Sequence, residues 1–580
     1  MAEPDQRSKH DMLAVVAICS LAVSVRLLFL ARWAGTPIFS SPVGDELNFH
    51  QTALALLSDH SLVSFLYQPL YSYFLAGVYW LFGPDVGTVR TIQLAIGVGT
   101  TVLFYGLGRE LSEGGDAGRW TGRLAGTIAA LYGPQVFFEG QLLAPALTLP
   151  LTAGALWCLL VAVRRSKPWV LIVGGLLLGL ACMGRPNLLV MLPAGLVWLL
   201  MRIRPWRWIW LSAGLLVGGV ILGLSPSWIH NAVSGQGFVP VSSSGGHSFF
   251  IGNNPQATGG FHIPKGMRID DSDHAAYRRS LTLLAERDAG RDLTPAEVSA
   301  YWWHRGLDFW AEHPGQALWL SGKKLLLELN SVERPIHYPY VFAQEVAPIL
   351  GYLLSFGIVF PFAVLGVWFG WRRRAGVGLL LGCAGAYMLT LVAFYVADRY
   401  RILLLAAFIP LAGLGMVEFA RTIRARGARR TWPHLLALAA AFAVTQLPLT
   451  SARAANQALV VGYNLMGKAA GERGNMGAAE KYFKHAIEIA GPGRGARARA
   501  NLGLLFQRRG RLERARRLYI EAAQDDPDWQ AIRVRLARLA ESRGDIQQAI
   551  HWWREAAALM ADPAPALSEI ERLEKRGTKR

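Results

Sequence analysis

Long apolar stretches recur along this chain and constrain its fold more than any other feature. We identify about eleven apolar runs with few charges, most of them roughly 17–25 residues long and so long enough to cross the hydrocarbon core of a bilayer as a helix, whereas the third and the sixth are shorter and could be discounted. They lie near residues 12–33, 86–108, 124–138, 142–163, 168–184, 187–202, 208–225, 346–370, 375–396, 402–420 and 432–449. Because a chain in lipid must satisfy its backbone hydrogen bonds internally, this pattern predicts an all-α, polytopic membrane helical bundle.

The distribution of charge supports a membrane protein and indicates its orientation. Only 17% of the 580 residues are charged and 52% are hydrophobic, which is too little charge for a soluble chain of this length. The net charge of +19 arises largely from clusters beside the apolar runs, at 164–167, 202–207, 372–374 and 421–430. By the positive-inside rule these clusters lie in the cytoplasm with the N-terminus. The segments 34–85 and 226–345 and the chain after residue 450 then face outward, and we expect no nucleic-acid partner.

The cysteines argue against a disulfide-linked protein, and the N-terminus argues against a cleaved signal peptide. The four cysteines all lie within apolar runs, so the outward loops hold no disulfide framework. The first apolar run resembles a signal peptide, but it is long, contains Arg26 and lacks a small-x-small cleavage site. We therefore expect an uncleaved first helix.

The outward segment 226–345 combines irregular and helical patterns. Residues 235–260 are dense in glycine, serine and asparagine, which predicts irregular backbone. Apolar positions at helical spacing then predict helices over 273–289 and 295–312. Long loops of this kind often serve as binding loops or lids.

The C-terminal region is repetitive. Gly474, Gly510 and Gly544 are each followed by alanine five residues later, and the glycine spacings of 36 and 34 residues are close to the ~34-residue period of tetratricopeptide repeats. We expect an α-solenoid over 451–580, which we predict to bind a protein, a glycan or an assembly partner.

The acidic pair Asp45-Glu46 follows the first apolar run and lies at the outer edge of the membrane. Ionisable groups at this position cost free energy unless they form an ion pair or have a function, so both acids are candidates for a functional site. A carboxylate there can accept a proton from an attacking hydroxyl or amine, or hold a metal. The alternative is that both are solvated loop acids or cap a following helix over 48–58.

Arginines at the outer ends of other runs form a second set of candidates. Arg185 joins two apolar runs, and Arg399, Tyr400 and Arg401 follow Asp398 after another. Arginine suits bidentate phosphate binding, so this set predicts a site for a lipid phosphate or pyrophosphate, with Arg90 as a weaker candidate. The alternatives are headgroup contact and pairing with Asp398 or Glu139.

Four further polar residues complete the candidate site. Glu139 is a carboxylate at an outer helix end that either joins Asp45 or pairs with an arginine. His247, Asn253 and Asn254 can donate to sugar hydroxyls or phosphate oxygens, and a turn role for the asparagines is the alternative. No complete metal-ligand set is visible, which leaves a divalent metal open, and no nucleotide-binding or metalloprotease motif competes.

These residues together resemble the GT-C membrane glycosyltransferases. The resemblance rests on Asp45-Glu46, Pro69-Leu-Tyr71 with Phe82-Gly83, Gly252-Asn-Asn and Arg399-Tyr400-Arg401, in that order and at one membrane face. It covers about residues 10–425, and in particular the chain looks like the bacterial relatives of protein O-mannosyltransferases and lipid A aminoarabinose transferases. The chain has no clear counterpart of the lysine-tyrosine-proline motif of the latter group, which argues against aminoarabinose.

The resemblance implies a sugar donor linked to polyprenyl phosphate and an active site in the periplasm of a bacterium, on the inner membrane. It implies Asp45 as the base with Glu46 beside it, Arg399 and Arg401 as ligands of the donor phosphate, and a less fixed role for Arg185. The expected domains are a GT-C-like transmembrane glycosyltransferase domain over 1–450 and a tetratricopeptide-repeat domain over 451–580. The expected acceptor is a protein, a glycan or a lipid.

Two other classes remain open from the residues alone. A transporter or flippase of lipid-linked saccharides also has many helices and outward arginines, but this chain shows no inverted internal repeat. A membrane-anchored repeat scaffold needs only one helix, which leaves the outward loop and Asp45-Glu46 without a role.

Overall fold

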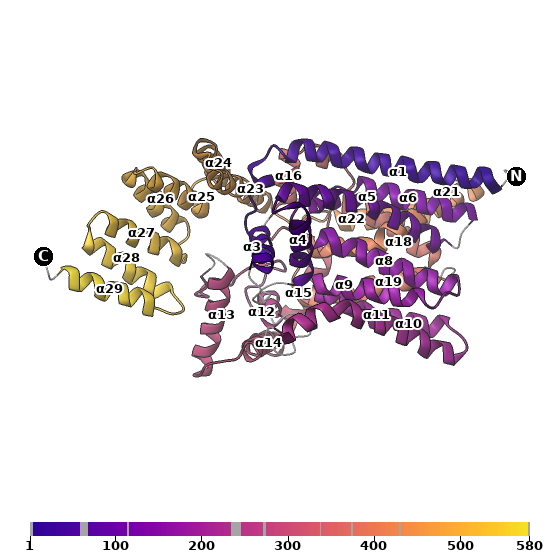
Figure 1. The fold of residues 1–580 in the computed structure, drawn as a ribbon, viewed down its shortest axis with the longest axis horizontal. Coiled ribbons are helices and arrows are strands. Elements are labelled where there is room, and N and C mark those ends of the chain that lie inside the picture. The colour runs from indigo at the N-terminus through magenta and orange to yellow at the C-terminus, as the bar shows by residue number, and fades with distance from the viewer. Residues whose placement is uncertain are drawn as a thin grey trace. The chain divides into compact units, whose positions relative to one another are not determined.

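The chain folds into helices that form two compact units (Figure 1). The computed structural model describes residues 4–58, 68–112, 115–233, 245–270, 274–336, 338–372, 375–427 and 431–577. The first unit comprises Met1–Ser242 and Ser321–Leu449, and the second comprises Ser243–Leu320 and Thr450–Arg580. The regular elements of the described residues are all helices, which confirms the predicted all-α class. The glycine-rich residues 234–244 lie outside the described residues.

The first unit is the membrane body. Its helices begin with α1 (Pro4–Trp33), α2 (Pro37–Ser40), α3 (Asp45–Ser58), α4 (Pro69–Phe82), α5 (Val86–Leu111), α6 (Gly115–Leu131), α7 (Gly133–Glu139), α8 (Pro145–Arg164), α9 (Val170–Gly184), η1 (Pro186–Val190), α10 (Met191–Arg202) and α11 (Trp206–Val233). They continue with α16 (Tyr340–Val346), α17 (Ile349–Tyr352), α18 (Phe356–Gly370), α19 (Ala375–Ala393), α20 (Asp398–Arg401), η2 (Ile402–Leu404), α21 (Leu405–Arg426) and α22 (Trp432–Thr445). Helix α15 (Pro314–Leu329) begins in the second unit and ends in the first.

Six described helices are long and apolar enough to cross a membrane. They are Lys9–Trp33, Val86–Leu111, Pro145–Arg164, Trp206–Val233, Gly376–Ala393 and Asp398–Ala425. Four shorter apolar helices accompany them: Val170–Gly184, Pro186–Arg202, Phe356–Gly370 and Trp432–Thr445. The chain is therefore a polytopic membrane protein, as its apolar runs predict.

Two predicted spans are interrupted. The run 124–138 breaks at Tyr132, where α6 ends and the short α7 begins with Gly133-Pro134. In the run 346–370, the long helix α18 begins only at Phe356 and continues to Gly370. The breaks meet each other, because the Gly133 nitrogen donates to the Leu354 carbonyl at 2.9 Å and the Leu354 nitrogen to the Leu131 carbonyl at 2.8 Å. Backbone groups freed by one break are thus satisfied by the other.

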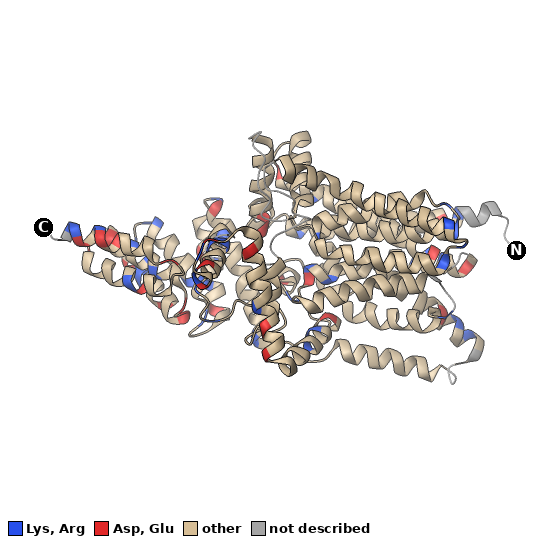
Figure 2. Ribbon diagram, turned by 90° about the horizontal axis from the view of Figure 1, so that it is seen from below, with Lys and Arg blue, Asp and Glu red and all other residues tan. Residues whose placement is uncertain are grey.

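Charge is distributed unevenly along the membrane body. In Figure 2 the middle of the helical bundle is almost free of coloured residues, which gather toward the helix ends. At one end Glu110 pairs with Arg164 at 2.9 Å, and Asp11 pairs with Arg123 at 3.0 Å. The opposite end, where α1 finishes and α5 begins, carries Asp45, Glu46 and Arg90.

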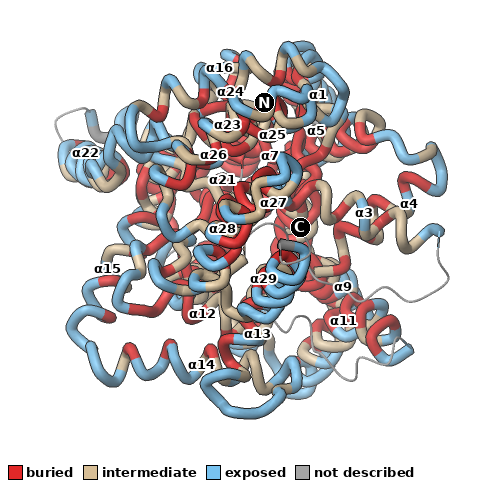
Figure 3. The backbone as a smooth tube through the Cα atoms, turned by 90° about the vertical axis from the view of Figure 1, so that its left-hand side faces the viewer, coloured by how far each residue is buried: buried red, intermediate tan, exposed pale blue. Residues whose placement is uncertain are grey.

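Small residues allow the membrane helices to pack closely. A Cβ atom on Gly175 of α9 would lie 2.1 Å from the Leu216 carbonyl oxygen, and one on Gly219 of α11 would lie 2.2 Å from that of Ile172. These are the close backbone contacts that glycine permits between membrane helices. Figure 3 contrasts α7, which is buried along its whole length, with the largely exposed α22.

The described residues between 245 and 320, which belong to the segment predicted to face outward, form helices in the second unit. They comprise α12 (Gly245–Gly252), α13 (His274–Ala289), α14 (Pro295–Glu312) and the first part of α15. The helices predicted over 273–289 and 295–312 are present, although Asp273 lies outside the described residues. The prediction of irregular backbone over 235–260 is wrong for 245–252. There Phe249 stacks on Trp303 at 4.1 Å, so tertiary packing stabilises a helix despite the local glycines.

The C-terminal helices form three consecutive pairs and a final helix. They are α23 (Ala452–Glu472) with α24 (Met476–Ala490), α25 (Ala496–Arg508) with α26 (Leu512–Asp525), α27 (Gln530–Ser542) with α28 (Ile546–Leu559), and α29 (Ala564–Gly577). Gly474, Gly510 and Gly544 turn the chain within each pair with φ values of 75°, 72° and 78°, which glycine adopts most easily. The alanines at 479, 515 and 549 are fully buried between the helices. The predicted tetratricopeptide-like α-solenoid is therefore present.

Candidate active site

Asp45 and Glu46 open helix α3, and both carboxylates are buried. Asp45 is 2% exposed and Glu46 is 0% exposed. The helix begins at Asp45, three residues before the predicted start, and acidic residues in the first turn favour its dipole. Consecutive residues on a helix point about 100° apart, and these two meet different arginines.

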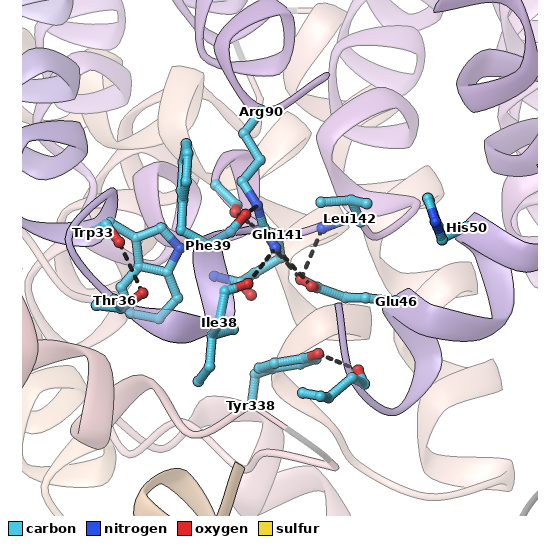
Figure 4. A network of polar contacts seen from close by, with 12 residues as sticks. Trp33, Thr36, Ile38, Phe39, Glu46, His50, Arg90, Gln141, Leu142 and Tyr338 are labelled. Carbon is cyan, nitrogen blue, oxygen red and sulfur yellow. Dashed lines mark hydrogen bonds and ion pairs between the residues drawn. The ribbon is translucent and has the colours of Figure 1, made fainter. Parts of the chain in front are cut away.

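Glu46 forms a fully buried ion pair with Arg90 of α5 (Figure 4). The Arg90 Nη2 lies 2.7 Å from the Glu46 Oε2, and both side chains are 0% exposed. The Glu46 Oε1 also accepts a hydrogen bond from the Leu142 nitrogen at 2.9 Å. Arg90 donates further to the backbone carbonyls of Ile38, Phe39 and Gly140. The pair therefore ties α2, α3, α5 and the chain after α7 together.

Neighbouring polar groups reinforce this junction. The Gln93 Nε2 donates to the carbonyls of Glu139 and Gln141 at 2.8 and 2.7 Å, which fixes the segment that Glu46 and Arg90 also bind. Tyr338 donates to the Val43 carbonyl just before α3, as Figure 4 shows. Because these backbone groups are paired, the first turn of α3 is held rigidly.

Asp45 meets Arg399, which lies 354 residues away in the sequence, in α20. The Arg399 Nη1 lies 2.5 Å from the Asp45 Oδ2. The Arg399 side chain is 17% exposed, whereas the Arg90 side chain is 0% exposed. Its Nη2 donates to the Tyr400 hydroxyl at 3.2 Å, and its buried Nε has no hydrogen-bond partner within the described part of the chain. The Arg399 side chain is thus partly accessible from outside the protein and keeps one unused hydrogen-bond donor.

Arg185 reaches the same place from the end of α9. Its guanidinium carbon lies 3.6 Å from the centroid of the Tyr400 ring, and that of Arg399 lies 5.2 Å from it. The Arg185 side chain is half-buried, and its guanidinium forms no hydrogen bond or ion pair with the described residues, only the contact with the Tyr400 ring. The Tyr400 hydroxyl is within 3.2 Å of that of Tyr395, and the Tyr387 hydroxyl donates to the Tyr400 carbonyl at 3.1 Å. Tyr400 therefore holds two cations in one place.

Arg401 has a different environment from its neighbour. Its Nη2 lies 2.7 Å from the Glu333 Oε1, its Nη1 donates to the carbonyls of Glu328 and Asn330, and its guanidinium stacks 4.6 Å from the Phe356 ring. The side chain is only 4% exposed. Its guanidinium is therefore engaged by an ion pair and hydrogen bonds, whereas that of Arg185 contacts only the Tyr400 ring among the described residues.

Glu139 pairs with Arg26 of α1. The Arg26 nitrogens Nε and Nη2 lie 2.7 and 2.8 Å from the two carboxylate oxygens of Glu139. The Gln135 side-chain amide also donates to the Glu139 carboxylate, at 2.8 Å. A Cβ atom on Gly97 would lie 2.1 Å from this carboxylate, so glycine there leaves room for the pair. The structure does not bring the Glu139 side chain to Asp45, and pairing with an arginine was the stated alternative.

His247, Asn253 and Asn254 belong to the second unit. The ring of His247 contacts the Tyr277 hydroxyl at 2.6 Å. The side-chain amides of Asn253 and Asn254 donate to carbonyls one turn earlier in α12, those of Phe249 and Phe250, at 2.8 and 2.9 Å. These hydrogen bonds close the end of the helix, so the asparagines have a local structural role, and their sugar-binding role stays a prediction.

Two residues of these networks, Arg26 and Glu333, were not predicted as part of the site, and only Arg26 carried a usable signal in the sequence. Arg26 is a charge inside an apolar run, and such a charge requires a partner, which is Glu139. Glu333 follows a helix of the outward segment with no motif around it, and only the fold brings it to Arg401. Among the described residues no group of three or more histidine, cysteine, aspartate or glutamate side chains is placed to hold a metal ion.

Comparison with known families supports the resemblance. Residues 60–230 match the family described as dolichyl-phosphate-mannose-protein mannosyltransferase, and residues 461–491 match a tetratricopeptide repeat. No curated protein matches the chain. The first match contains Arg90, Glu139 and Arg185, whereas Asp45 and Arg399 lie outside it. The chain is thus a membrane protein that is similar over residues 60–230 to the GT-C-type dolichyl-phosphate-mannose-protein mannosyltransferases, a glycosyltransferase family, and that matches a tetratricopeptide repeat near its C-terminus.

Proposed function

We propose that this protein transfers a sugar from a polyprenyl-phosphate donor to a hydroxyl of a protein, glycan or lipid acceptor, at the periplasmic face of the bacterial inner membrane. The observation that carries the proposal is the meeting of Asp45 with Arg399, beside Arg185 on the ring of Tyr400. A carboxylate base and two cations at one place suit a reaction in which a hydroxyl loses a proton while a phosphate gains charge.

The reaction is a single displacement. The acceptor oxygen forms a bond with the anomeric carbon as the bond from that carbon to the phosphate oxygen breaks, which inverts the configuration. The proton of the acceptor hydroxyl passes to Asp45, and the polyprenyl phosphate leaves with an additional negative charge. Arg399 and Arg185 stabilise this charge, since both hold guanidinium donors that the protein leaves unused.

Arg399 connects donor binding to the base. While the pair is intact, the Arg399 guanidinium occupies the Asp45 carboxylate and competes with the acceptor hydroxyl for it. The donor phosphate competes for the same guanidinium. Its binding draws Arg399 away from Asp45 and leaves the carboxylate able to accept the acceptor proton.

Glu46 and Arg90 position the base. Their donors and acceptors are engaged with each other and with the backbone around α3, so neither is available to substrate. The pair holds the first turn of α3, and hence Asp45, at the helix end.

The test is sugar transfer by the purified full-length protein in nanodiscs. The substrate is polyprenyl-phosphate mannose with a radiolabelled sugar, and the acceptor is an envelope extract from a deletion strain. We expect Asp45→Asn to lower the transfer rate by about 10²–10⁴-fold. The matched control is Asp85→Asn, because Asp85 caps α5 with an exposed side chain and asparagine caps equally well.

Wild-type transfer by the Asp45→Asn protein would show that Asp45 is not the base. In a parallel assay with the protein in sealed vesicles, label that crosses the membrane without forming a new glycosidic bond would instead favour a transporter.

A further inference from the structure

Glu328 is a buried acid whose side chain has no partner in the described chain. It lies near the end of α15, in the part of that helix that belongs to the first unit, and it is 0% exposed. Both of its carboxylate oxygens are buried and accept no hydrogen bond, and among the described acids only Glu328 has two such oxygens. A buried polar group without a partner costs free energy, and few such groups occur in folded proteins. The Glu328 carboxyl is therefore a candidate for binding a ligand.

Several contacts place this acid beside α20. The Arg401 Nη1 donates to the Glu328 backbone carbonyl at 3.3 Å. The Tyr387 hydroxyl of α19 donates to the Tyr400 carbonyl at 3.1 Å. The Glu328 carboxyl and the Arg185 guanidinium both lie within electrostatic range of that hydroxyl. The Glu328 carboxyl therefore lies close to the place where Arg185 contacts the Tyr400 ring.

Asn187 supplies a second unused acceptor at the same place. It follows Arg185 by two residues, in η1, and its side-chain nitrogen donates to the Thr390 hydroxyl of α19 at 3.0 Å. The Asn187 side chain also reaches the Tyr387 hydroxyl. Its side-chain oxygen is buried and accepts no hydrogen bond from the described residues. Two acceptor groups, one from α15 and one from η1, thus converge on Tyr387.

The protonation of Glu328 defines what these two groups can bind. Burial raises the pKa of Glu328 to about 8, although Arg401 opposes the rise and Glu333 adds to it, so the carboxyl keeps its proton at neutral pH. A protonated carboxyl donates one hydrogen bond and accepts others, and the Asn187 oxygen only accepts. A hydroxyl group both donates and accepts, so hydroxyl groups satisfy both side chains. An ammonium group is disfavoured, because Arg185 and Arg401 already bring positive charge to this place.

We propose that Glu328 and Asn187 bind hydroxyl groups of the sugar that the lipid-phosphate donor carries. The sugar is joined directly to the phosphate, so it must lie beside the arginines that bind the phosphate, as these two residues do. The proposal rests on the proposed function for the identity of the donor. It adds the residues that recognise the sugar and the class of that sugar, which is neutral and has free hydroxyl groups.

The test measures donor binding to the full-length protein in nanodiscs, without an acceptor. Radiolabelled farnesyl phosphate is displaced either by unlabelled farnesyl phosphate or by farnesyl-phosphate mannose, and the ratio of the two dissociation constants reports the contribution of the sugar. Glu328→Met removes both oxygens at similar volume, whereas Glu328→Gln keeps one donor and one acceptor. The control is Glu418→Met, the same replacement near the far end of α21, where Glu418 pairs with Arg421 at 3.5 Å.

We expect Glu328→Met to bind farnesyl-phosphate mannose about tenfold more weakly and farnesyl phosphate within about twofold of the wild type, because only the sugar loses hydrogen bonds. Glu328→Gln should bind both lipids within about threefold of the wild type, and Glu418→Met within about twofold. Asn187→Leu should also weaken binding of the mannose lipid selectively, and it decides the question if thermal unfolding shows that Glu328→Met does not fold.

Equal weakening of both lipids by Glu328→Met would overturn the proposal, because it would indicate a structural role, and so would unchanged binding of the mannose lipid. Tighter binding of farnesyl-phosphate glucosamine than of the mannose lipid, lost in Glu328→Met, would assign the site to an ammonium group instead. Because the assay contains no acceptor, a failure of sugar transfer leaves these results unchanged, and the two proposals fail separately.

Discussion

Asp45 and Glu46 are adjacent in the sequence, yet their arginine pairs differ in almost every physical respect. The Glu46–Arg90 pair has no exposed surface and is surrounded by backbone hydrogen bonds. The Asp45–Arg399 pair is partly open, and Arg399 retains an unused donor. A closed pair maintains structure, whereas an open pair can exchange its partner for a substrate. Adjacent acids of one motif thus have different roles because their environments differ.

The first way to test this contrast is to remove one charge at a time. Asp45→Asn should lower transfer by about 10²–10⁴-fold and should lower the thermal unfolding midpoint less than Glu46→Gln does, because it removes the base while the Arg399 charge keeps partial contact with water. Glu46→Gln should lower the midpoint, because it leaves the Arg90 charge buried without its partner. Transfer assays and thermal unfolding in nanodiscs measure both effects. Equal effects of the two variants on both readouts would remove the distinction.

The second test concerns the closed pair. Arg90→Met should destabilise the protein by about 3–5 kcal/mol, because the Glu46 carboxylate would then be buried alone. The double variant Glu46→Gln with Arg90→Met should recover part of this loss, since it removes both charges. The midpoint of chemical unfolding measures the difference. No recovery in the double variant would mean that the backbone contacts of Arg90, rather than the ion pair, dominate.

The third test compares the two arginines of one motif. Arg399→Lys should raise the KM for the polyprenyl-phosphate donor by about tenfold, because lysine cannot bind a phosphate in a bidentate manner. Arg401→Lys should mainly lower stability, since its donors contact Glu333 and backbone carbonyls. Steady-state kinetics with varied donor separates these results. An equal rise in KM for Arg401→Lys would favour the assignment of both arginines to the phosphate.

The fourth test uses a buried acid that lacks any such pair. Both carboxylate oxygens of Glu328 are buried without a hydrogen-bond partner in the described chain, and burial, with Glu333 adding to it, raises its pKa to about 8. Between the ordinary pKa of 4.5 and about 8, the folded state keeps a proton that the unfolded state releases. The free energy of unfolding should therefore fall as pH rises through this window, by about 1 kcal/mol per pH unit.

Glu328→Gln should remove this pH dependence, because glutamine does not titrate. Chemical unfolding at pH 5, 6, 7 and 8 measures the pH dependence of the unfolding free energy, because these values span the window. A slope that persists in the variant would assign the pH dependence to another group.

Much of the fold follows from local patterns. The long apolar runs predict the membrane helices, because hydropathy and length suffice for a helix in lipid. The glycine and alanine spacing predicts the solenoid, because each repeat packs only against its neighbours. The breaks at Tyr132 and before Phe356 were not predicted, since they depend on backbone hydrogen bonds between segments more than 200 residues apart.

The sequence by itself identifies which acids and arginines are candidates for a functional site, because charged residues beside apolar runs need a partner or a function in any fold. Their pairing was decided only by the tertiary structure. Arg399 meets Asp45, Arg90 meets Glu46 and Arg26 meets Glu139 across 354, 44 and 113 residues. Burial and pairing depend on which helices pack together, and no local pattern encodes that arrangement.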